Sequence, residues 1–500
     1  MNRSKKAVLN LAAQLLLQAT VAICGFVVPK LILEGFGSDV NGIVTSISQF
    51  LGIIALLETG FGGVAKAAFY KPLASGDRKA ISGVYNATES FFRKIALIFA
   101  LYCVVLSVGF PLINDGGFDF WFTATLVLIL GISSFAQYYF GMSYSIALNA
   151  DQLSFIGALL QVGAVILNAV ITVVLLNLGA GIHVVKLVSA SVFVLKPIVI
   201  NLYGRHRYRV DKKVPKDDNS LSQKWDNLAQ GIASYVHTKA SYVLMTIFMT
   251  FREVSVYSVY SLVTTSLSSI ITSISTGFVS GLGNMYANGE KENYKKVFSL
   301  YEFVNTIITF GFFTVACITM MRFVDIYTMN LTDVDYHRPV FGTILVVAEL
   351  LYCLRLPYYY AIGNAGHFKQ TKRGAWIEAI INISLSLILL PFLGIIGLAI
   401  GTAVAMAVRS TDLIIYCCKN ITEMKCVFVM KRMVVNFMAA IASIGLCSFI
   451  GFETNDFVMW IVYACLVSVV TFGVVLAVNL IFYREDAKLL FKKIRTAFSR

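Results

Sequence analysis

Charged residues are scarce in this chain: only 14% of its 500 residues are Asp, Glu, Lys or Arg, whereas 58% are hydrophobic. A water-soluble protein of this length needs far more polar surface, so the composition excludes a soluble globular domain. Apolar runs of about 20 residues recur along the whole chain, which is the length that crosses a bilayer as a helix. The sequence therefore predicts an all-α polytopic membrane protein.

Metal-site and redox spacings are also missing. The nine cysteines form no CxxC motif, and most of them fall inside apolar runs, where Cys usually acts as a small hydrophobic residue. The net charge of +14 comes without a basic and aromatic patch of the kind that binds DNA or RNA. We therefore expect no metal, no cofactor and no nucleic-acid partner.

The apolar runs predict about fourteen transmembrane spans. Two of them, which end at Leu393 and begin at Ile395, are separated only by a tight turn over Pro391 to Gly394. A polar segment before the third span, Lys71 to Lys94, is predicted to form an amphipathic helix on the membrane surface. The predicted spans are 8–33, 41–65, 91–113, 120–146, 155–178, 183–203, 229–250, 255–280, 299–321, 340–361, 375–393, 395–417, 433–452 and 457–482.

Positive charge alternates between the connecting segments. The predicted external loops contain only Lys186, Arg252, Arg322 and Arg338, whereas most of the 41 Lys and Arg residues fall in the segments on the other side. Cytoplasmic loops of membrane proteins carry this excess. The bias predicts a multi-pass protein with both termini in the cytoplasm and with membrane lipids as its surroundings.

The two halves of the chain repeat each other weakly. Thr59-Gly60-Phe61 returns as Thr276-Gly277-Phe278, and a basic segment lies between the halves. Two units in the same orientation imply a pseudo-two-fold axis along the membrane normal. We therefore predict two pseudo-symmetric six-helix lobes, related as parallel repeats, with two extra C-terminal helices. The predicted limits are 1–203 for the N-lobe, 204–228 for the cytoplasmic linker, 229–417 for the C-lobe, and 418–500 for the last two spans with a basic tail.

Polar side chains recur at helical spacing within several spans. Such stripes mark faces turned away from lipid, either toward other helices or toward a wet cavity, and both interpretations stay open. The second and eighth spans carry matching stripes, as do the fifth and eleventh. The residues predicted to form a polar cavity wall are Asn41, Ser48, Thr59, Asn168, Ser258, Thr265, Thr272 and Asn382.

Ionisable residues within spans are costly and are therefore candidates for function. Lys239 and Arg355 have no obvious partner on their own helix and are the main candidates for binding an anion, together with Lys196 and Arg409. Arg409 also has Asp412 three residues later, which favours a local ion pair. The carboxylates of Glu58, Glu349 and Glu378 are candidates for binding a coupling proton or sodium ion, or for neutralising the nearby cations.

The chain resembles the polysaccharide transporter branch of the superfamily that also contains multidrug (MATE) exporters and the lipid II flippase. The resemblance covers nearly the whole chain and rests on NLAAQLLLQATVAICGFVVPKLIL, on VNGIVTSISQFLGIIALLETGFGGVAKAAFYKPLASGD, and on the repeat with its basic linker. The first two segments are most similar to Wzx-type O-antigen and capsule flippases. The two additional C-terminal spans are more similar to the lipid II flippase.

This resemblance implies a non-enzymatic flippase that moves undecaprenyl-diphosphate-linked oligosaccharides across the bacterial cytoplasmic (inner) membrane by alternating access. Lys239, Arg355 and Lys196 would then supply the cations that members of this branch carry in a central cavity. We also expect the protein to be a monomer and to work beside polysaccharide assembly enzymes. Transport would be coupled to a proton or sodium gradient or to the membrane potential.

Three alternatives remain open from the sequence. An ion-coupled multidrug exporter needs a cavity that attracts cations, and a lipid II-type flippase carries a related lipid-linked glycan. A polysaccharide assembly enzyme needs clustered acidic or His residues at an exposed loop, for which Asp333, Asp335 and His337 are the only candidates.

Overall fold

The computed structural model describes residues 3–113, 117–217, 239–452 and 456–488, and within them it leaves out the side chains of residues 3–5, 7, 56–60 and 280. The chain divides into two compact units, Met1–Ser255 and Val256–Arg500. We describe each unit by itself. The predicted domain limits, which place a linker at 204–228, stay a prediction.

The first helix is too long to cross a membrane once. α1 runs from Arg3 to Leu51, and Gly37 inside it has φ of 81° and ψ of 176°, a conformation that ends one helix and starts another. After Gly37 the chain continues through a 3₁₀ turn, Gly52–Ile54, into α2, Ala55–Ser75. The break at Gly37 therefore separates the first predicted span from the second.

The described residues contain twelve helices long and apolar enough to span a membrane, and a shorter apolar helix, Lys239–Phe248. Counting the two parts of α1 separately and adding the shorter helix gives about fourteen helices. The all-α class and the predicted number of spans are therefore confirmed. The remaining elements are α3 Arg78–Ile113, α4 Phe120–Ala136, the π-turn η2 Gln137–Gly141, α5 Met142–Ala150, α6 Ser154–Asn177, α7 Ile182–Tyr208, α9 Phe251–Ala287, α10 Lys291–Tyr327, α11 Pro339–Leu354, α12 Leu356–Asn364, α13 Phe368–Leu393, α14 Ile395–Cys417, the π-turn η4 Cys418–Thr422, α15 Cys426–Cys447 and α16 Phe457–Phe482.

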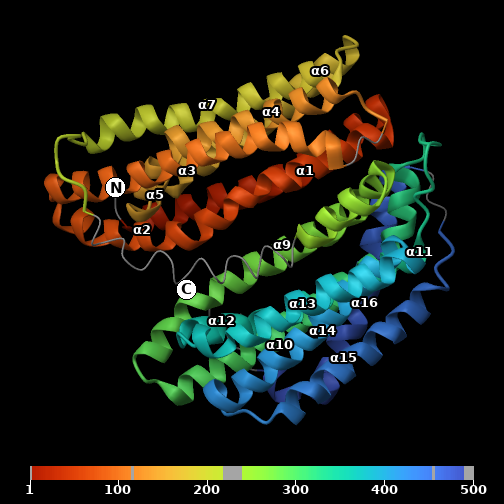
Figure 1. Ribbon diagram of the computed structural model, residues 1–500. Helices are drawn as coiled ribbons and strands as arrows, with labels where there is room; N and C mark the ends of the chain where they lie inside the picture. The colour runs from red at the N-terminus through yellow and green to blue at the C-terminus, as the bar shows by residue number, and fades with distance from the viewer. Residues whose placement is uncertain (1–2, 114–116, 218–238, 453–455, 489–500) are drawn as a thin grey trace. The chain divides into compact units, whose positions relative to one another are not determined.

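In the first unit α1, α3, α4, α6 and α7 lie side by side as long rods (Figure 1). The prediction of an amphipathic helix over 71–94 is wrong about where that helix begins. α2 ends at Ser75, Gly76 adopts φ of 68°, and α3 begins at Arg78 and continues without interruption into the third span. A left-handed glycine ends a helix because it lacks a Cβ that would clash in that conformation.

The segment after α7 is held along the start of α3. Asn86 donates hydrogen bonds from Nδ2 to the backbone oxygens of Asp211 and Val214, at 3.0 and 2.9 Å. Lys216 donates to Ser90, and Lys212 pairs with Glu89. The beginning of the basic linker is therefore part of the first unit's surface.

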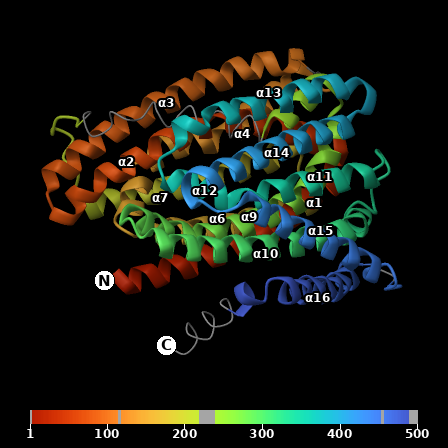
Figure 2. The same ribbon diagram turned by 90° about the horizontal axis from the view of Figure 1, so that it is seen from below.

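In the second unit α13 and α14 form the tight hairpin predicted at Gly394, which has φ of 55°. The two helices approach closely at Gly401, where a Cβ would lie 2.4 Å from the Ser386 hydroxyl. Glycine is thus required for this crossing, as in small-residue contacts between membrane helices. α16 packs beside α15 and α10 (Figure 2).

A buried ion cluster joins α10, α15 and the segment after α16. Arg432, with a fully buried side chain, pairs with Glu302, and its Nη2 lies 2.5 Å from Asp486 Oδ2. Burial raises the pKa of Asp486, and Arg432 opposes that rise. The guanidinium also lies 4.6 Å from the ring centre of Phe428 and 5.0 Å from that of Tyr483.

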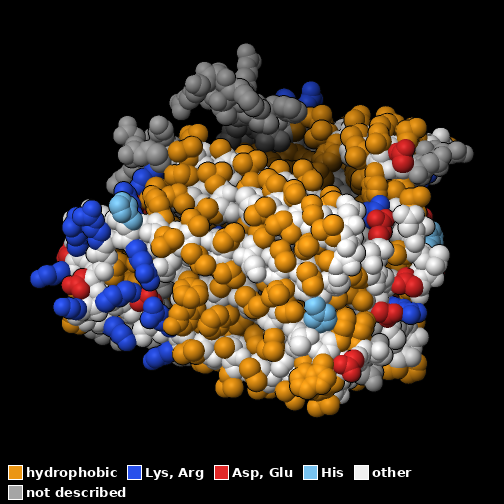
Figure 3. All heavy atoms as spheres, turned by 90° about the horizontal axis from the view of Figure 1, so that it is seen from above, with side chains coloured by type: hydrophobic (Ala, Val, Ile, Leu, Met, Phe, Trp, Pro, Cys, Tyr) orange, Lys and Arg blue, Asp and Glu red, His pale blue; other side chains and the backbone are white. Residues whose placement is uncertain are grey.

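Large hydrophobic side chains face outward along the middle of the helices. Leu101, Val105 and Ile388 are each more than 60% exposed. Figure 3 shows such side chains as a broad band on the face in view, with Lys and Arg gathered at one end. Because an exposed apolar surface of this extent is unfavourable in water, and because at least twelve helices are long and apolar enough to span, the protein is a multi-pass membrane protein.

Candidate functional site

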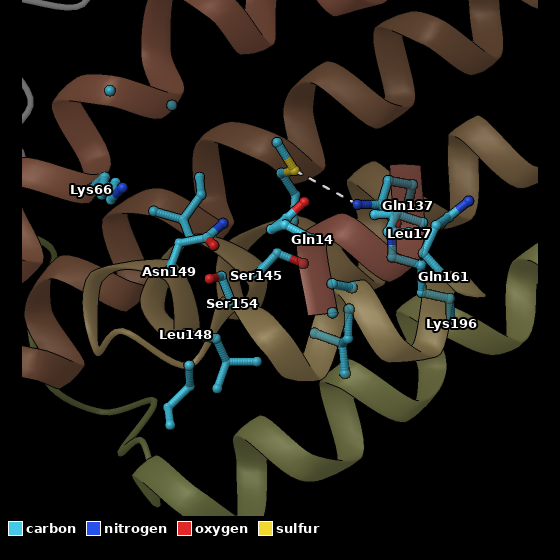
Figure 4. A pocket seen from close by; sticks show the side chains of 18 of the residues that line it. Gln14, Leu17, Lys66, Gln137, Ser145, Leu148, Asn149, Ser154, Gln161 and Lys196 are labelled. Carbon is cyan, nitrogen blue, oxygen red and sulfur yellow. Dashed lines mark hydrogen bonds between the residues drawn. The ribbon is translucent and has the colours of Figure 1, made fainter. Parts of the chain in front are cut away.

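A cavity of about 650 Å³ lies inside the first unit. Five elements line it: α1, α2, α5, α6 and α7, with a contribution from the π-turn η2. Its volume is in the range of small-molecule sites. The polar side chains on its wall, most of them visible in Figure 4, are Gln14, Lys66, Gln137, Ser145, Asn149, Ser154, Gln161 and Lys196.

The π-turn sets the position of the cavity wall between α4 and α5. Gly141 packs so closely on α7 that a Cβ would lie 2.6 Å from Pro197 Cβ. Asn201 of α7 donates a hydrogen bond from Nδ2 to the Phe140 backbone oxygen at 2.7 Å. These contacts hold Gln137 of the turn and Lys196 of α7 against the same space, as single π-turns often do at functional sites.

The turn between α5 and α6 borders the cavity and is tied down on both sides. Lys6 Nζ lies 2.8 Å from Asp151 Oδ1, and Arg207 Nη2 lies 3.2 Å from Asp151 Oδ2. Asn10 donates to the Gln152 backbone oxygen and accepts from the Phe155 backbone N–H. The turn therefore connects the ends of α1 and α7 while its flanking residues line the cavity.

The two cations of the wall lie apart. Figure 4 shows Lys66 on one side of the cavity and Lys196 on the other, with Gln14, Ser145 and Asn149 between them. None of the lining residues that the structure describes is acidic. The side chain of Glu58, between the lining residues Ala55 and Gly62, is outside the described set. Amide and hydroxyl groups can both donate to and accept from sugar hydroxyls.

Lys239 lies away from this cavity, in a row of polar contacts between α1 and the residues that follow the linker. Its Nζ donates to Gln49 Oε1 at 2.5 Å. Asn41 of the predicted wall donates to Ser255 Oγ at 2.7 Å, and Thr246 donates to Ser46 at 2.9 Å. Asn41, from the predicted polar stripe of the second span, therefore contacts another helix of the first unit and does not line the cavity.

Other members of the predicted wall bond to their own helix. Ser48 donates to the Val44 backbone oxygen, and Thr265 donates to the Ser261 backbone oxygen. Thr265 is exposed within the second unit and Thr272 is half-buried, as is Ser258. The side chain of Thr59 is outside the described residues. The pattern missed a second, buried stripe on α9, where Ser268 donates to Glu349 Oε2 at 2.7 Å.

The predicted cations of the second unit meet a shared carboxylate. Arg355 Nη1 lies 2.9 Å from Glu378 Oε1, and Arg409 Nε lies 3.4 Å from Glu378 Oε2. Arg409 also pairs with Asp412 at 2.6 Å, the local pair that the spacing favours. Glu378 thus neutralises cations here, and the anion-binding and ion-coupling roles predicted for these residues stay predictions.

Asn168 and Asn382 hold matching places on α6 and α13. Both are buried, and the Oδ1 atom of each has no hydrogen-bond partner among the described residues. Asn382 Nδ2 donates to Thr402 at 3.4 Å. Neither side chain lines the cavity.

The sequence pattern missed Lys66 as a site residue. Lys66 directly follows the apolar run 41–65, so the sequence assigns it to the basic loop after the second span. Its helix continues to Ser75, so the side chain remains on a structured wall. Gln14 and Gln161 also line the cavity.

No protein-family model matches this sequence, and no curated protein matches it. Solved structures do match. A lipid II flippase MurJ in an inward closed conformation matches at TM-score 0.72 and 16% identity, over 96% of this chain and 99% of that one.

Two MATE transporters are also similar in fold. The MATE multidrug transporter DinF-BH has TM-score 0.62 and 14% identity over 85% of this chain and 97% of its own. The eukaryotic MATE transporter AtDTX14 has TM-score 0.60 and 15% identity over 87% and 98%. The chain therefore has the fold shared by MurJ and the MATE transporters, as the sequence predicts, while the narrower likeness to Wzx-type flippases stays a prediction.

Proposed function

We propose that this protein is a flippase that moves polyprenyl-diphosphate-linked oligosaccharides across a bacterial cytoplasmic membrane. The cavity of the first unit carries the proposal: it combines Lys66 and Lys196 with amide and hydroxyl groups, and its described wall contains no carboxylate. A diphosphate takes charge-assisted hydrogen bonds from ammonium groups, and sugars take bonds from amides. Both needs are met in one space.

Within this proposal the anion site lies at Lys66 and Lys196 of the first unit. In the second unit Arg355 and Arg409 are ion-paired with two carboxylates, Glu378 of α13 and Asp412 of α14. Such a network leaves little net charge to attract a substrate. The two units would therefore do different work, with binding on the first and a rigid ion-paired core in the second.

Transport would proceed by alternating access of this cavity to the two membrane faces. The protein would act without chemical change to its substrate, so it is not an enzyme in this proposal. In this hypothesis a proton or sodium gradient or the membrane potential drives transport. The protein works as a monomer beside polysaccharide assembly enzymes. Glu58 and Glu349 remain the carboxylates to test for coupling.

A multidrug exporter is the second candidate, because DinF-BH, which is similar in fold, is a multidrug transporter. Cationic drugs require a cavity with negative charge. The described wall of this cavity holds two lysines and no acid, so its electrostatics favour an anionic substrate. A lipid II-type substrate is a third candidate with the same diphosphate chemistry.

The test is a translocation assay in proteoliposomes loaded with a labelled polyprenyl-diphosphate oligosaccharide. A membrane-impermeant glycosidase reports how much substrate reaches the outer leaflet. We expect protein-dependent translocation that falls by about tenfold or more in the Lys66→Gln, Lys196→Gln double variant, because each lost charge-assisted hydrogen bond costs about 1.5–3 kcal/mol.

The matched control is the Lys71→Gln, Lys186→Gln double variant. It removes one lysine each from α2 and α7, neither of which lines the cavity. We expect translocation close to that of the unmodified protein. No translocation by the unmodified protein, together with gradient-driven efflux of a cationic dye, would replace the flippase with an exporter.

A further inference from the structure

One exposed face of α3 changes from apolar to basic at the predicted membrane boundary. Residues that are three, four or seven positions apart on a helix lie on the same side. Leu101, Ile98 and Lys94 share such a face, and all three side chains are exposed. The third span is predicted to begin at residue 91, so Lys94 lies at the level where lipid head groups meet the hydrocarbon.

The docked segment, residues 211–217, brings a second lysine to this face. Lys216 Nζ donates a hydrogen bond to Ser90 Oγ at 2.9 Å. Ser90 lies four residues before Lys94, which is about 6 Å along the helix axis and on the same side. Lys216 is 126 positions away from Ser90 in the sequence, so the docking of the segment is what places both lysines at one end of this face.

Hydrogen bonds near both ends of the docked segment fix it on α3. Asn86 donates to the backbone oxygens of Asp211 and Val214, at 3.0 and 2.9 Å. The Asp217 backbone N–H donates to the Gly83 backbone oxygen at 3.2 Å. Lys216 is therefore held beside Ser90 by the backbone on either side of it.

The acidic residue of α3 next to Ser90 already has cationic partners. Glu89 accepts a hydrogen bond from Arg93 at 3.1 Å and pairs with Lys212. Among the residues that the structure describes, no carboxylate lies within ion-pair distance of the ammonium group of Lys94 or Lys216. The basic end of this face therefore retains positive charge for an external anion.

The apolar part of the face shows which kind of anion fits. Exposed hydrophobic side chains continue from Lys94 for about three helical turns, through Leu97 and Leu101 to Val105. A soluble anion would gain nothing from these side chains. A phosphate that carries acyl chains would gain charge-assisted hydrogen bonds at one end and apolar contact along the rest.

We propose that Lys94 and Lys216 bind the phosphate of an anionic phospholipid whose acyl chains lie along the exposed apolar face of α3. Phosphate oxygens accept charge-assisted hydrogen bonds from ammonium groups. The charge bias predicts that this end of α3 faces the cytoplasm, where anionic lipids attract lysines that lie next to a span. The inference does not depend on the proposed function, because no residue of α3 lines the cavity.

The test is photo-crosslinking in phosphatidylcholine proteoliposomes that contain the full-length protein. Two probes carry the same diazirine acyl chain, one on anionic phosphatidylglycerol and one on phosphatidylcholine, which has no net charge. Peptide mass spectrometry measures the labelling of residues 97–105. We expect about tenfold or more labelling by the anionic probe relative to the neutral one, because each lysine near an anionic lipid contributes about a fivefold preference.

Three variants test the roles of the lysines and of the docked segment. The Lys94→Gln, Lys216→Gln double variant is expected to lower the labelling ratio to about one without changing the labelling by phosphatidylcholine. The matched control, Lys419→Gln with Lys425→Gln, removes two exposed lysines of the second unit and should keep the ratio. Asn86→Ala retains both lysines and loosens the docked segment, so the ratio should fall partway. Unchanged thermal unfolding in detergent shows that each variant is folded.

The outcomes that contradict the inference are distinct. Equal labelling by the two probes in the unmodified protein would overturn it. A preference for phosphatidylglycerol that survives the double variant would overturn the role of the two lysines. Competition by unlabelled polyprenyl diphosphate, without competition by equal amounts of unlabelled phosphatidylglycerol, would overturn the choice of a phospholipid. Because none of these readings uses translocation, failure of the flippase assay would leave the inference intact.

Discussion

Arg355 donates a hydrogen bond from Nη1 to Glu378 Oε1 over 2.9 Å, and both side chains are at least nine-tenths buried. The two residues are 23 positions apart. Arg355 lies in the turn between α11 and α12, and Glu378 lies in α13. Arg409 approaches the other oxygen of the same carboxylate. Glu378 is therefore the shared partner of two buried guanidinium groups, while Asp412 contacts only Arg409. This makes Glu378 a sensitive point of the fold.

Glu378→Ala is expected to destabilise the protein by about 3–5 kcal/mol, because it leaves Arg355 and Arg409 buried without their shared partner. The change is measured as a fall in the thermal unfolding midpoint in detergent. Glu423→Ala is the control, since Glu423 is exposed and pairs with Lys295 at the surface. An equal fall in the unfolding midpoint for the two variants would show that the burial of the ion pairs does not determine the loss of stability.

Gly401→Ala is expected to weaken the packing of α13 on α14, because its Cβ would lie 2.4 Å from Ser386 Oγ and 2.9 Å from Ser386 N. We expect a loss of about 1–3 kcal/mol, as in other overpacked sites. Gly445→Ala in α15 is the matched control, because a Cβ there meets no atom within 4 Å. It should leave stability unchanged or raise it by up to about 1 kcal/mol. Effects of the same sign would argue against the steric account.

Arg432→Ala is expected to release the helices α15 and α16 from α10. The substitution leaves Glu302, which is 1% exposed, as a buried and unpaired carboxylate. We expect faster proteolytic cleavage after Cys447, read by mass spectrometry, and a lower unfolding midpoint. Lys431→Ala, at the exposed neighbouring position, should behave like the unmodified protein. Unaltered cleavage in Arg432→Ala would show that the cluster does not hold these helices.

Asp151→Ala is expected to loosen the turn between α5 and α6, because Lys6, Arg207 and Tyr208 all bond to this side chain. Amide hydrogen exchange of residues 150–155 should accelerate, while exchange in α13 stays unchanged. Asp151→Asn retains one acceptor oxygen and should show an intermediate effect. If exchange of the turn is insensitive to both substitutions, the turn is held by its backbone bonds and by Asn10 instead.

Helix number and helix limits were largely predictable because apolar run length has one physical cause, the thickness of the bilayer. The hairpin at Gly394 followed from the shortness of the polar interruption. The continuous start of α3 was not predictable in this way. Its polar residues are compatible with a surface helix, and only the left-handed Gly76 and the docked segment at Asp211 show where the helix begins.

The partners of buried charges were harder to predict. The local pair of Arg409 with Asp412 follows from a spacing of three residues. The pairing of Arg355 with Glu378 depends on how the end of α11 packs against α13, which helical periodicity does not contain. Lys66 was missed for a related reason, since a loop lysine and a cavity lysine look alike until the length of α2 is known.

The π-turn at Gln137–Gly141 makes the cavity wall tolerant of a change in chain length. A π-turn contains one residue more than the α-helical turn it replaces. Deleting a single residue there would let the turn close as an ordinary α-helical turn, so Ser145 and Asn149 of α5 would still face the cavity. The same deletion within regular α-helix would turn every later residue of that helix by about 100°. Homologues that lack one residue in this short stretch would therefore keep the same cavity wall, and an alignment gap placed elsewhere would conceal that equivalence.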